Sequence, residues 1–294
     1  MNILSQILAN VIISWSMIFL VGISFLLIFS TARFFHFGHA SVITVGAYIC
    51  YYFIKIIHFP APISILMGIV VAAVLGYGLE LIIFKRMRLN GASSLTLLLA
   101  SIGGYIVIQN IISLFFGDQI VVLNDSILFS SISIVGSKIT AMQLLLIGLA
   151  ILFLLSKIYL IDKTKLGLAL RAVSDNPELA SISGIDEDKI MFVAFFLSSI
   201  LGGIAGIVRA FDIGMTPTTG LDMLLSGVVA VVIGGNGATI GVAVASILLA
   251  SFQQFASWQF GEMWKDSITF AVLLAYLLLR PQGIYIKSIR KTEV

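Results

Sequence analysis

Two of the three histidines of this chain, His36 and His39, lie three residues apart in a short break between apolar segments. Residues at i and i+3 of a helix face the same side, so the two imidazoles could act together. They do not predict a metal site, because catalytic zinc normally takes three protein ligands and no carboxylate is close in sequence. A neutral imidazole offers one hydrogen-bond donor and one acceptor. We therefore expect His39 either to bond backbone groups freed by a helix break or to line a cavity.

The chain lacks the common motifs of enzymes. It has no G-x-x-x-x-G-K-[ST], so it does not bind ATP through a P-loop of its own, and no H-E-x-x-H or G-x-S-x-G. The single cysteine, Cys50, excludes an internal disulfide and a cysteine-based metal cluster. We expect no catalytic residue, metal or cofactor, which makes a membrane-embedded enzyme the weaker alternative.

The composition indicates whether these residues lie in water or in a membrane. Hydrophobic residues make up 60% of the chain, charged residues only 11%, and the mean hydropathy is +1.13. A soluble domain carries roughly 25% charged residues. The apolar runs are long and continuous, which favours helices over a barrel. We predict an all-α polytopic membrane protein with no nucleic-acid partner.

A single transmembrane domain over residues 1–294 is expected, with about eight or nine transmembrane or re-entrant helices. The segments at 40–57 and 222–236 could either span the bilayer or re-enter it, because each adjoins a glycine-containing break. The nine expected segments are 8–30, 40–57, 62–84, 93–116, 138–160, 190–211, 222–236, 239–258 and 267–280.

The positive-inside rule orients these segments. One membrane topology brings every basic cluster to the cytoplasm. In it the N-terminus is outside, the C-terminus is inside and the loop 117–137 is outside. The clusters are Arg33; Lys85, Arg86 and Arg88; Lys157, Lys163, Lys165 and Arg171; and Lys287, Arg290 and Lys291.

Few charges fall within the expected spans. Glu80 is expected to reach toward Lys85 and Arg86, and Arg209 to pair with Asp212 three residues later. An ion-coupled carrier usually needs an ionisable group in mid-membrane. A secondary transporter or channel that works alone is therefore the weaker alternative.

Small and uncharged polar residues remain as candidates for a substrate pathway, with helix–helix contact as their alternative role. Glycine-broken segments commonly mark a transport pathway. The candidates are Gly38, His39, Ser101, Gln109, Asn110, Ser226, Gly234, Gly235 and Gly237.

The longest hydrophilic stretch, 161–189, is expected to fold as two short helices. Pro177 suits a first helical turn and Gly184 suits a C-cap. Such a structured loop should dock against a partner, although an ordinary solvated connector is the alternative.

Three stretches resemble one known family, the branched-chain amino acid ABC transporter permeases. "FHFGHASVITVGAY", "GLALRAVSDNPELASISGID" and "VVAVVIGGNGATIGVAVAS" occur in the family's order and spacing, over about residues 10–285. The resemblance implies an importer permease in the inner membrane lipid bilayer. It also implies a homologous second permease subunit, two P-loop ATPase subunits that bind the ATP, and an extracytoplasmic substrate-binding protein.

The resemblance also assigns roles to residues. The loop 161–189 is similar to the E-A-A-x-x-x-G signature through which importer permeases contact their ATPase, with Leu179 in place of the central alanine. His39 stands on the family histidine. The ATPase-coupling residues implied are Arg171, Asp175, Glu178, Ala180 and Gly184.

The implied cargo is a branched-chain, hydrophobic amino acid. The sequence departs from many family members, however, at Ile240–Gly241, where proline-glycine is usual, and at Ser226, where some carry lysine. Relatives of the same architecture resemble permeases for urea, short amides or simple sugars, and these cargoes remain open alternatives.

Overall fold

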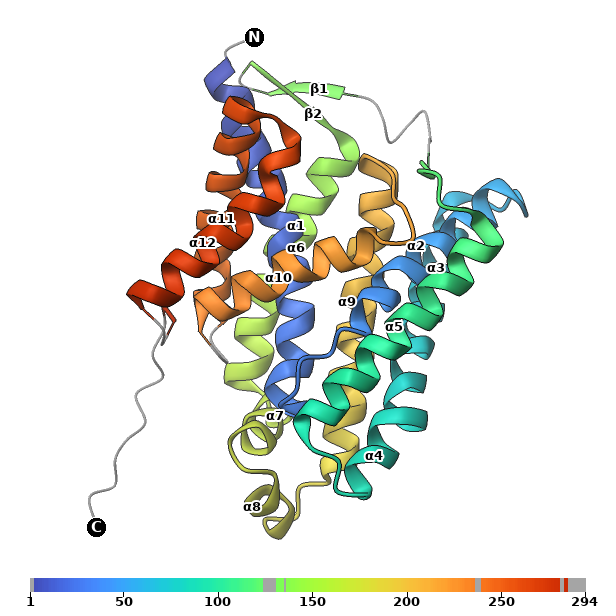
Figure 1. The fold of residues 1–294 in the computed structure, drawn as a ribbon, viewed down its shortest axis with the longest axis vertical. Coiled ribbons are helices and arrows are strands. Elements are labelled where there is room, and N and C mark those ends of the chain that lie inside the picture. The colour runs from blue at the N-terminus through green and yellow to red at the C-terminus, as the bar shows by residue number, and fades with distance from the viewer. Residues whose placement is uncertain (1–2, 124–130, 135, 236–238, 281–282, 285–294) are drawn as a thin grey trace.

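The computed structural model describes residues 3–123, 131–134, 136–235, 239–280 and 283–284 (Figure 1). Helices dominate the described residues, and five are long and apolar enough to cross a membrane: Ile3–Ala32, Ala61–Leu89, Ser94–Phe116, Glu187–Asp212 and Thr239–Phe260. The elements in order are α1 (Ile3–Ala32), α2 (His39–Lys55), α3 (Ala61–Leu79), the π-helix η1 (Glu80–Phe84), α4 (Lys85–Leu89), α5 (Ser94–Phe116), β1 (Ser131–Ile134), β2 (Ser137–Thr140), α6 (Ala141–Lys163), α7 (Lys165–Asp175), α8 (Pro177–Ile182), α9 (Glu187–Asp212), α10 (Thr219–Gly234), α11 (Thr239–Phe260), the 3-10 helix η2 (Glu262–Trp264) and α12 (Lys265–Leu279).

The expected all-α membrane fold is confirmed, and each of the nine expected segments contains a helix. One local expectation is wrong, because the segment 138–160 starts as strand β2, which pairs antiparallel with β1. Helix α6 begins only at Ala141. There Thr140 Oγ1 accepts from the Gln143 backbone N–H at 3.2 Å, and Gln143 Oε1 accepts from the Thr140 N–H at 3.0 Å. This reciprocal capping box fixes the helix start.

Helices α1 and α9 form the centre of the molecule. In the most apolar 18-residue stretch of each helix, 72% of the residues of α1 and 67% of those of α9 are buried, against 22% in α5. Helix α1 packs against α6, α9, α10 and α11, whereas α2 and α3 pack against α9. The outer helix α5 therefore presents most of its apolar surface outward, away from the rest of the chain.

Helix α10 is short for a helix that crosses the bilayer. Its 16 residues give a length of about 24 Å, less than the roughly 30 Å of a hydrocarbon core. Figure 1 shows it lying across the long axes of α1 and α9. The described part of the segment 222–236 thus lies among the other helices of the bundle, and residue 236 lies outside the described residues.

Glycines bring α2, α3 and α9 into backbone contact. A Cβ added at Gly46 would lie 2.9 Å from the Cα of Gly203, and one added at Gly206 would overlap the carbonyl oxygen of Ile43. Small residues at such positions let membrane helices gain dispersion energy along their backbones.

The Gly206→Val variant should unfold at a lower temperature than the native chain. Forcing a side chain into this contact typically costs about 1–3 kcal/mol. Thermal unfolding of the purified chain in mild detergent measures the effect. Gly148→Val is the matched control on α6, because nothing among the described residues lies within 4 Å of a Cβ there. Equal melting of both variants would contradict the packing argument.

Candidate functional site

The two histidines are fully buried where α1 gives way to α2. His39 Nε2 lies 3.0 Å from Ser24 Oγ, and Ser24 Oγ donates its own hydrogen to the carbonyl of Val21 at 2.7 Å. The shared hydrogen must then come from His39, which is the Nε2–H tautomer. Ser198 Oγ donates to the carbonyl of Ser24 at 2.6 Å, so these bonds join α1, α2 and α9.

The backbone freed at this break is bonded by Ser101 of α5 instead of by His39. The Phe37 N–H donates to Ser101 Oγ at 3.1 Å, and Ser101 Oγ lies 2.8 Å from the carbonyl of Leu98. The hydrogen bond described for His39 is to the Ser24 hydroxyl rather than to this freed backbone, and its expected role in lining a cavity stays a prediction.

Gly38 adjoins this cluster, and the remaining candidate pathway residues lie apart from it. Asn110 is exposed on α5 and bonds the carbonyl of Ile106 in its own helix at 2.7 Å, and Gln109 beside it is half-buried. Gly234 and Gly235 are buried at the end of α10, while Gly237 lies outside the described residues. Gly38 is buried beside His36. The candidates thus do not converge on one site, and their pathway role stays a prediction.

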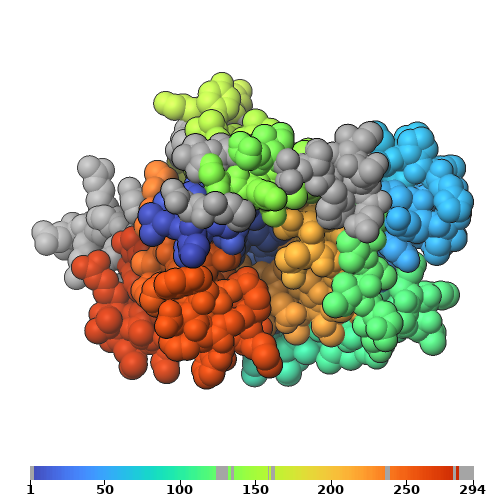
Figure 2. Space-filling view, turned by 90° about the horizontal axis from the view of Figure 1, so that it is seen from above, coloured from blue at the N-terminus to red at the C-terminus, as the bar shows by residue number. Residues whose placement is uncertain are grey.

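A pocket of about 310 Å³, which we call the charged pocket, opens between α1, α9, α10, α11 and α12. It lies toward the end of the molecule that carries the N-terminus, and Figure 2 shows a hollow between α1, α9 and the α11–α12 hairpin on that face. Ser226 is part of its wall. Six charged side chains also line it: Arg209, Asp212, Asp222, Glu262, Lys265 and Asp266.

Some of these charges already have partners. Lys265 forms an ion pair with Glu262. Burial alone would raise the pKa of Glu262, but hydrogen bonds from Lys265 and Ser257 lower it, which keeps this carboxylate ionised. Gln143 Nε2 donates to Asp212 Oδ1 at 3.0 Å.

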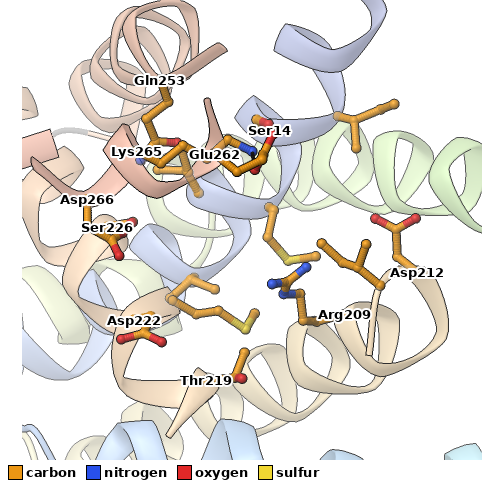
Figure 3. A pocket seen from close by; sticks show the side chains of 16 residues that line it. Ser14, Arg209, Asp212, Thr219, Asp222, Ser226, Gln253, Glu262, Lys265 and Asp266 are labelled. Carbon is orange, nitrogen blue, oxygen red and sulfur yellow. Dashed lines mark ion pairs between the residues drawn. The ribbon is translucent and has the colours of Figure 1, made fainter. Parts of the chain in front are cut away.

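The expected Arg209–Asp212 pair is wrong, because Asp212 at the end of α9 turns toward α6 while Arg209 points into the pocket (Figure 3). Within the described part of the chain, neither Arg209 nor Asp222 nor Asp266 forms an ion pair or a side-chain hydrogen bond. One cation and two anions therefore face the pocket without an ion pair or hydrogen bond, and Arg209 and Asp222 attract each other only at longer range.

At the opposite end of the molecule, α7 and α8 form the two short helices expected for 161–189. Asn176 caps α8 by accepting from the Leu179 N–H at 3.1 Å, and Pro177 occupies the first turn. Ala180 is buried against Val173 and Ile190. Gly184 follows α8 with φ +83°, a conformation that favours glycine.

The proposed coupling residues are spread over these helices. Glu178 and Gly184 are exposed at α8, Asp175 is exposed at the end of α7, and Arg171 is partly buried within α7. Sequence analysis missed Ile182, which exposes 83% of its surface beside Leu179 at 60%. The available signal was that Leu179 and Ile182, two apolar residues, lie three apart in the longest hydrophilic stretch of the chain.

Arg33 was predicted as a cytoplasmic basic residue, but its contact with α7 was not. Its Nη2 donates to the carbonyls of Ser174 at 2.7 Å and Asp175 at 2.6 Å, the last carbonyls of α7. Arg33 itself has φ +56°, an uncommon conformation for a residue other than glycine. One side chain thus links α7 to the joint between α1 and α2.

The expected partners of Glu80 are also wrong. The Glu80 carboxylate is 3% exposed and pairs with both terminal nitrogens of Arg88, while Lys85 pairs with Asp188 at 2.9 Å. The cause is η1, whose wide π-turn changes which way the following residues face.

Comparison with known proteins identifies the family of the chain. A family model described as "Branched-chain amino acid transport system / permease component" matches residues 7–277. The chain belongs to this permease family. It is therefore a multi-pass membrane protein of a transporter family rather than of an enzyme family.

Curated relatives of this permease share about a quarter of its residues. The high-affinity branched-chain amino acid transport system permease protein BraD of Pseudomonas aeruginosa is 26% identical over 278 residues, 90% of each chain. The probable branched-chain amino acid transport permease protein LivH of Methanocaldococcus jannaschii is 28% identical over 299 residues, 95% of this chain and 91% of that one. The solved structure of PsaBC from Streptococcus pneumoniae in complex with Fab matches the permease with a TM-score of 0.54 at 12% identity, over 98% of this chain and 95% of that chain. That likeness shows the fold alone.

Proposed function

We propose that this permease is one subunit of an ABC importer that carries branched-chain amino acids across the inner membrane. The observation that supports it most is the family match over residues 7–277, to which the relatives named for branched-chain amino acid transport add the cargo. Two P-loop ATPase subunits, a homologous second permease and an extracytoplasmic binding protein complete the assembly. The N-terminus faces outward, and α7 and α8 face the cytoplasm.

The surface of α7 and α8 favours a partner over a solvated connector. Leu179 and Ile182 expose apolar area in water at the loop tip, where an ATPase groove would cover it. The structure joins the same loop to the bundle through Arg33. Movement of an ATPase bound at α8 would thus reach both α9 and the α1–α2 joint.

Reconstituted transport tests this function. Proteoliposomes that contain the full set of subunits should accumulate labelled leucine when ATP is supplied, and tagged permease should copurify with a P-loop ATPase. ATP-driven uptake of urea, a short amide or a simple sugar without uptake of leucine would reassign the cargo. Isolation of the permease alone, together with ATP-independent uptake, would favour a channel or secondary carrier.

The Ile182→Glu variant should lose most copurifying ATPase and at least about tenfold of uptake, because a charge would have to be buried in an apolar contact. Ile182→Met keeps the apolar surface and is the matched control. Glu178→Ala and Gly184→Pro should leave membrane insertion intact and lower the uptake per ATP hydrolysed. Normal uptake by Ile182→Glu would remove the loop tip from the ATPase contact.

A further inference from the structure

We propose that the charged pocket binds the zwitterion of a free α-amino acid, with its carboxylate on Arg209 and its ammonium group on Asp222 and Asp266. The inference rests on the proposed function and adds to it a binding site within this subunit. It follows from which charges in the pocket are already partnered, from where the remaining ones lie, and from the apolar surface beside them.

The unpartnered charges have the signs that a zwitterion requires. Arg209 is the one lining cation of the described residues outside an ion pair, and Asp222 and Asp266 are the lining carboxylates without a described partner. A guanidinium binds a carboxylate with two parallel hydrogen bonds, and a carboxylate accepts strongly from an ammonium group. An amino acid would neutralise one charge of each sign within the same pocket.

The placement of these groups fits one small molecule. Figure 3 shows the guanidinium of Arg209 turned toward the middle of the pocket, with Asp222 and Asp266 on one side and Asp212 on the other. These residues come from α9, α10 and α12, so binding would tie three helices together. The volume of about 310 Å³ lies at the lower end of the range for small-molecule sites, roughly 300–1,000 Å³.

The wall beside the charges suits a branched apolar side chain. Helix α1 contributes Ile13, Met17, Ile18 and Val21, and α10 contributes Met223. Methionine side chains adapt to the shape of what they contact. The pocket therefore combines two opposite charges with an apolar wall, which is the chemistry of a hydrophobic amino acid.

Neutral cargoes fit this arrangement less well. A sugar or urea would displace water from Arg209 and the two carboxylates without giving any of them a direct contact of opposite charge, which costs free energy. The site thus distinguishes the amino acid from the alternatives that the sequence leaves open.

Ligand-observed NMR titration of the full-length permease in lipid nanodiscs, without the soluble binding protein, tests the site. Three probes share one carbon skeleton: leucine, 3-methylbutan-1-amine without the carboxylate, and 4-methylpentanoate without the ammonium group. Leucine should bind the native chain at least about tenfold more tightly than either probe, because each probe lacks one charge-assisted contact.

Two variants give opposite patterns that misfolding cannot imitate. Arg209→Gln should weaken leucine about 10- to 100-fold and leave the amine nearly unchanged. The double variant Asp222→Asn, Asp266→Asn should weaken leucine similarly and leave 4-methylpentanoate unchanged or tighter. Asp118→Asn, an exposed acid that does not line the pocket, is the control and should bind leucine normally.

Equal leucine affinity in all variants, or equal binding of the three probes, would overturn the site. Proteoliposome uptake separates this outcome from failure of the proposed function. If the native assembly takes up leucine but the variants bind leucine with unchanged affinity, only the site is refuted. Absence of ATP-driven leucine uptake by the native assembly refutes the proposed function itself.

Discussion

Replacing Arg88 with alanine is expected to lower the unfolding free energy of the permease by about 3 kcal/mol or more. The Glu80 carboxylate is buried and held at both oxygens by Arg88, so the truncation would leave a buried charge without its partner. Breaking one side of such a pair typically costs about 3–5 kcal/mol. The lower end applies here, because 21% of the Arg88 side chain is exposed.

Denaturant unfolding in mixed micelles measures this loss, and two variants test its cause. Arg86→Ala removes the same charge from an exposed neighbour that has no ion pair within the described ranges, so it should change stability little. Adding Glu80→Gln to Arg88→Ala should recover most of the loss, because the remaining amide is uncharged. If Arg88→Ala were no worse than Arg86→Ala, the buried pair would not hold the helix in place.

Replacing Arg33 with alanine is expected to lower leucine uptake by about tenfold while ATP hydrolysis continues. Its two hydrogen bonds to the end of α7 are charge-assisted, although their exposure to solvent weakens each of them. Without them α7 could move without displacing the joint that carries His36 and His39. The leucine transported per ATP hydrolysed in proteoliposomes measures the coupling.

Two substitutions at position 33 separate the side chain from the backbone. Arg33→Lys keeps one cation that can reach the α7 carbonyls and should retain part of the coupling. Arg33→Gly relaxes the positive φ and removes the side chain, so it should uncouple as alanine does. If glycine restored the native ratio, the backbone conformation would be the cause and the hydrogen bonds would not.

The elements of this fold could be predicted from local signals. Long apolar runs gave the helices, and Pro177 and Gly184 delimited α8, because capping depends on residues close in sequence. The hairpin β1–β2 escaped prediction although Ser131–Ile134 alternates polar and apolar residues, because each strand has only four residues and the long apolar run of α6 follows directly.

The polar contacts could not be predicted, because each depends on which helices meet. Glu80 pairs with Arg88 instead of its nearer neighbours, and Asp212 bonds Gln143, which is 69 residues away in sequence. The charged pocket likewise draws on five helices and η2, and no short motif marks it. Local spacing finds residues able to pair, but tertiary packing decides which of them do.

The π-turn η1 has a consequence for insertions and deletions in this part of the chain. A π-turn amounts to one extra residue in an otherwise α-helical segment. If Glu80–Phe84 kept its five residues but wound as a continuous α-helix, everything after it would rotate by about 100°, the angle of one residue. Arg88 and Lys85 would then turn away from Glu80 and Asp188 together. Deleting one residue from this segment would remove the π-turn without that rotation, so homologues that keep both ion pairs should have either the π-turn or a segment one residue shorter.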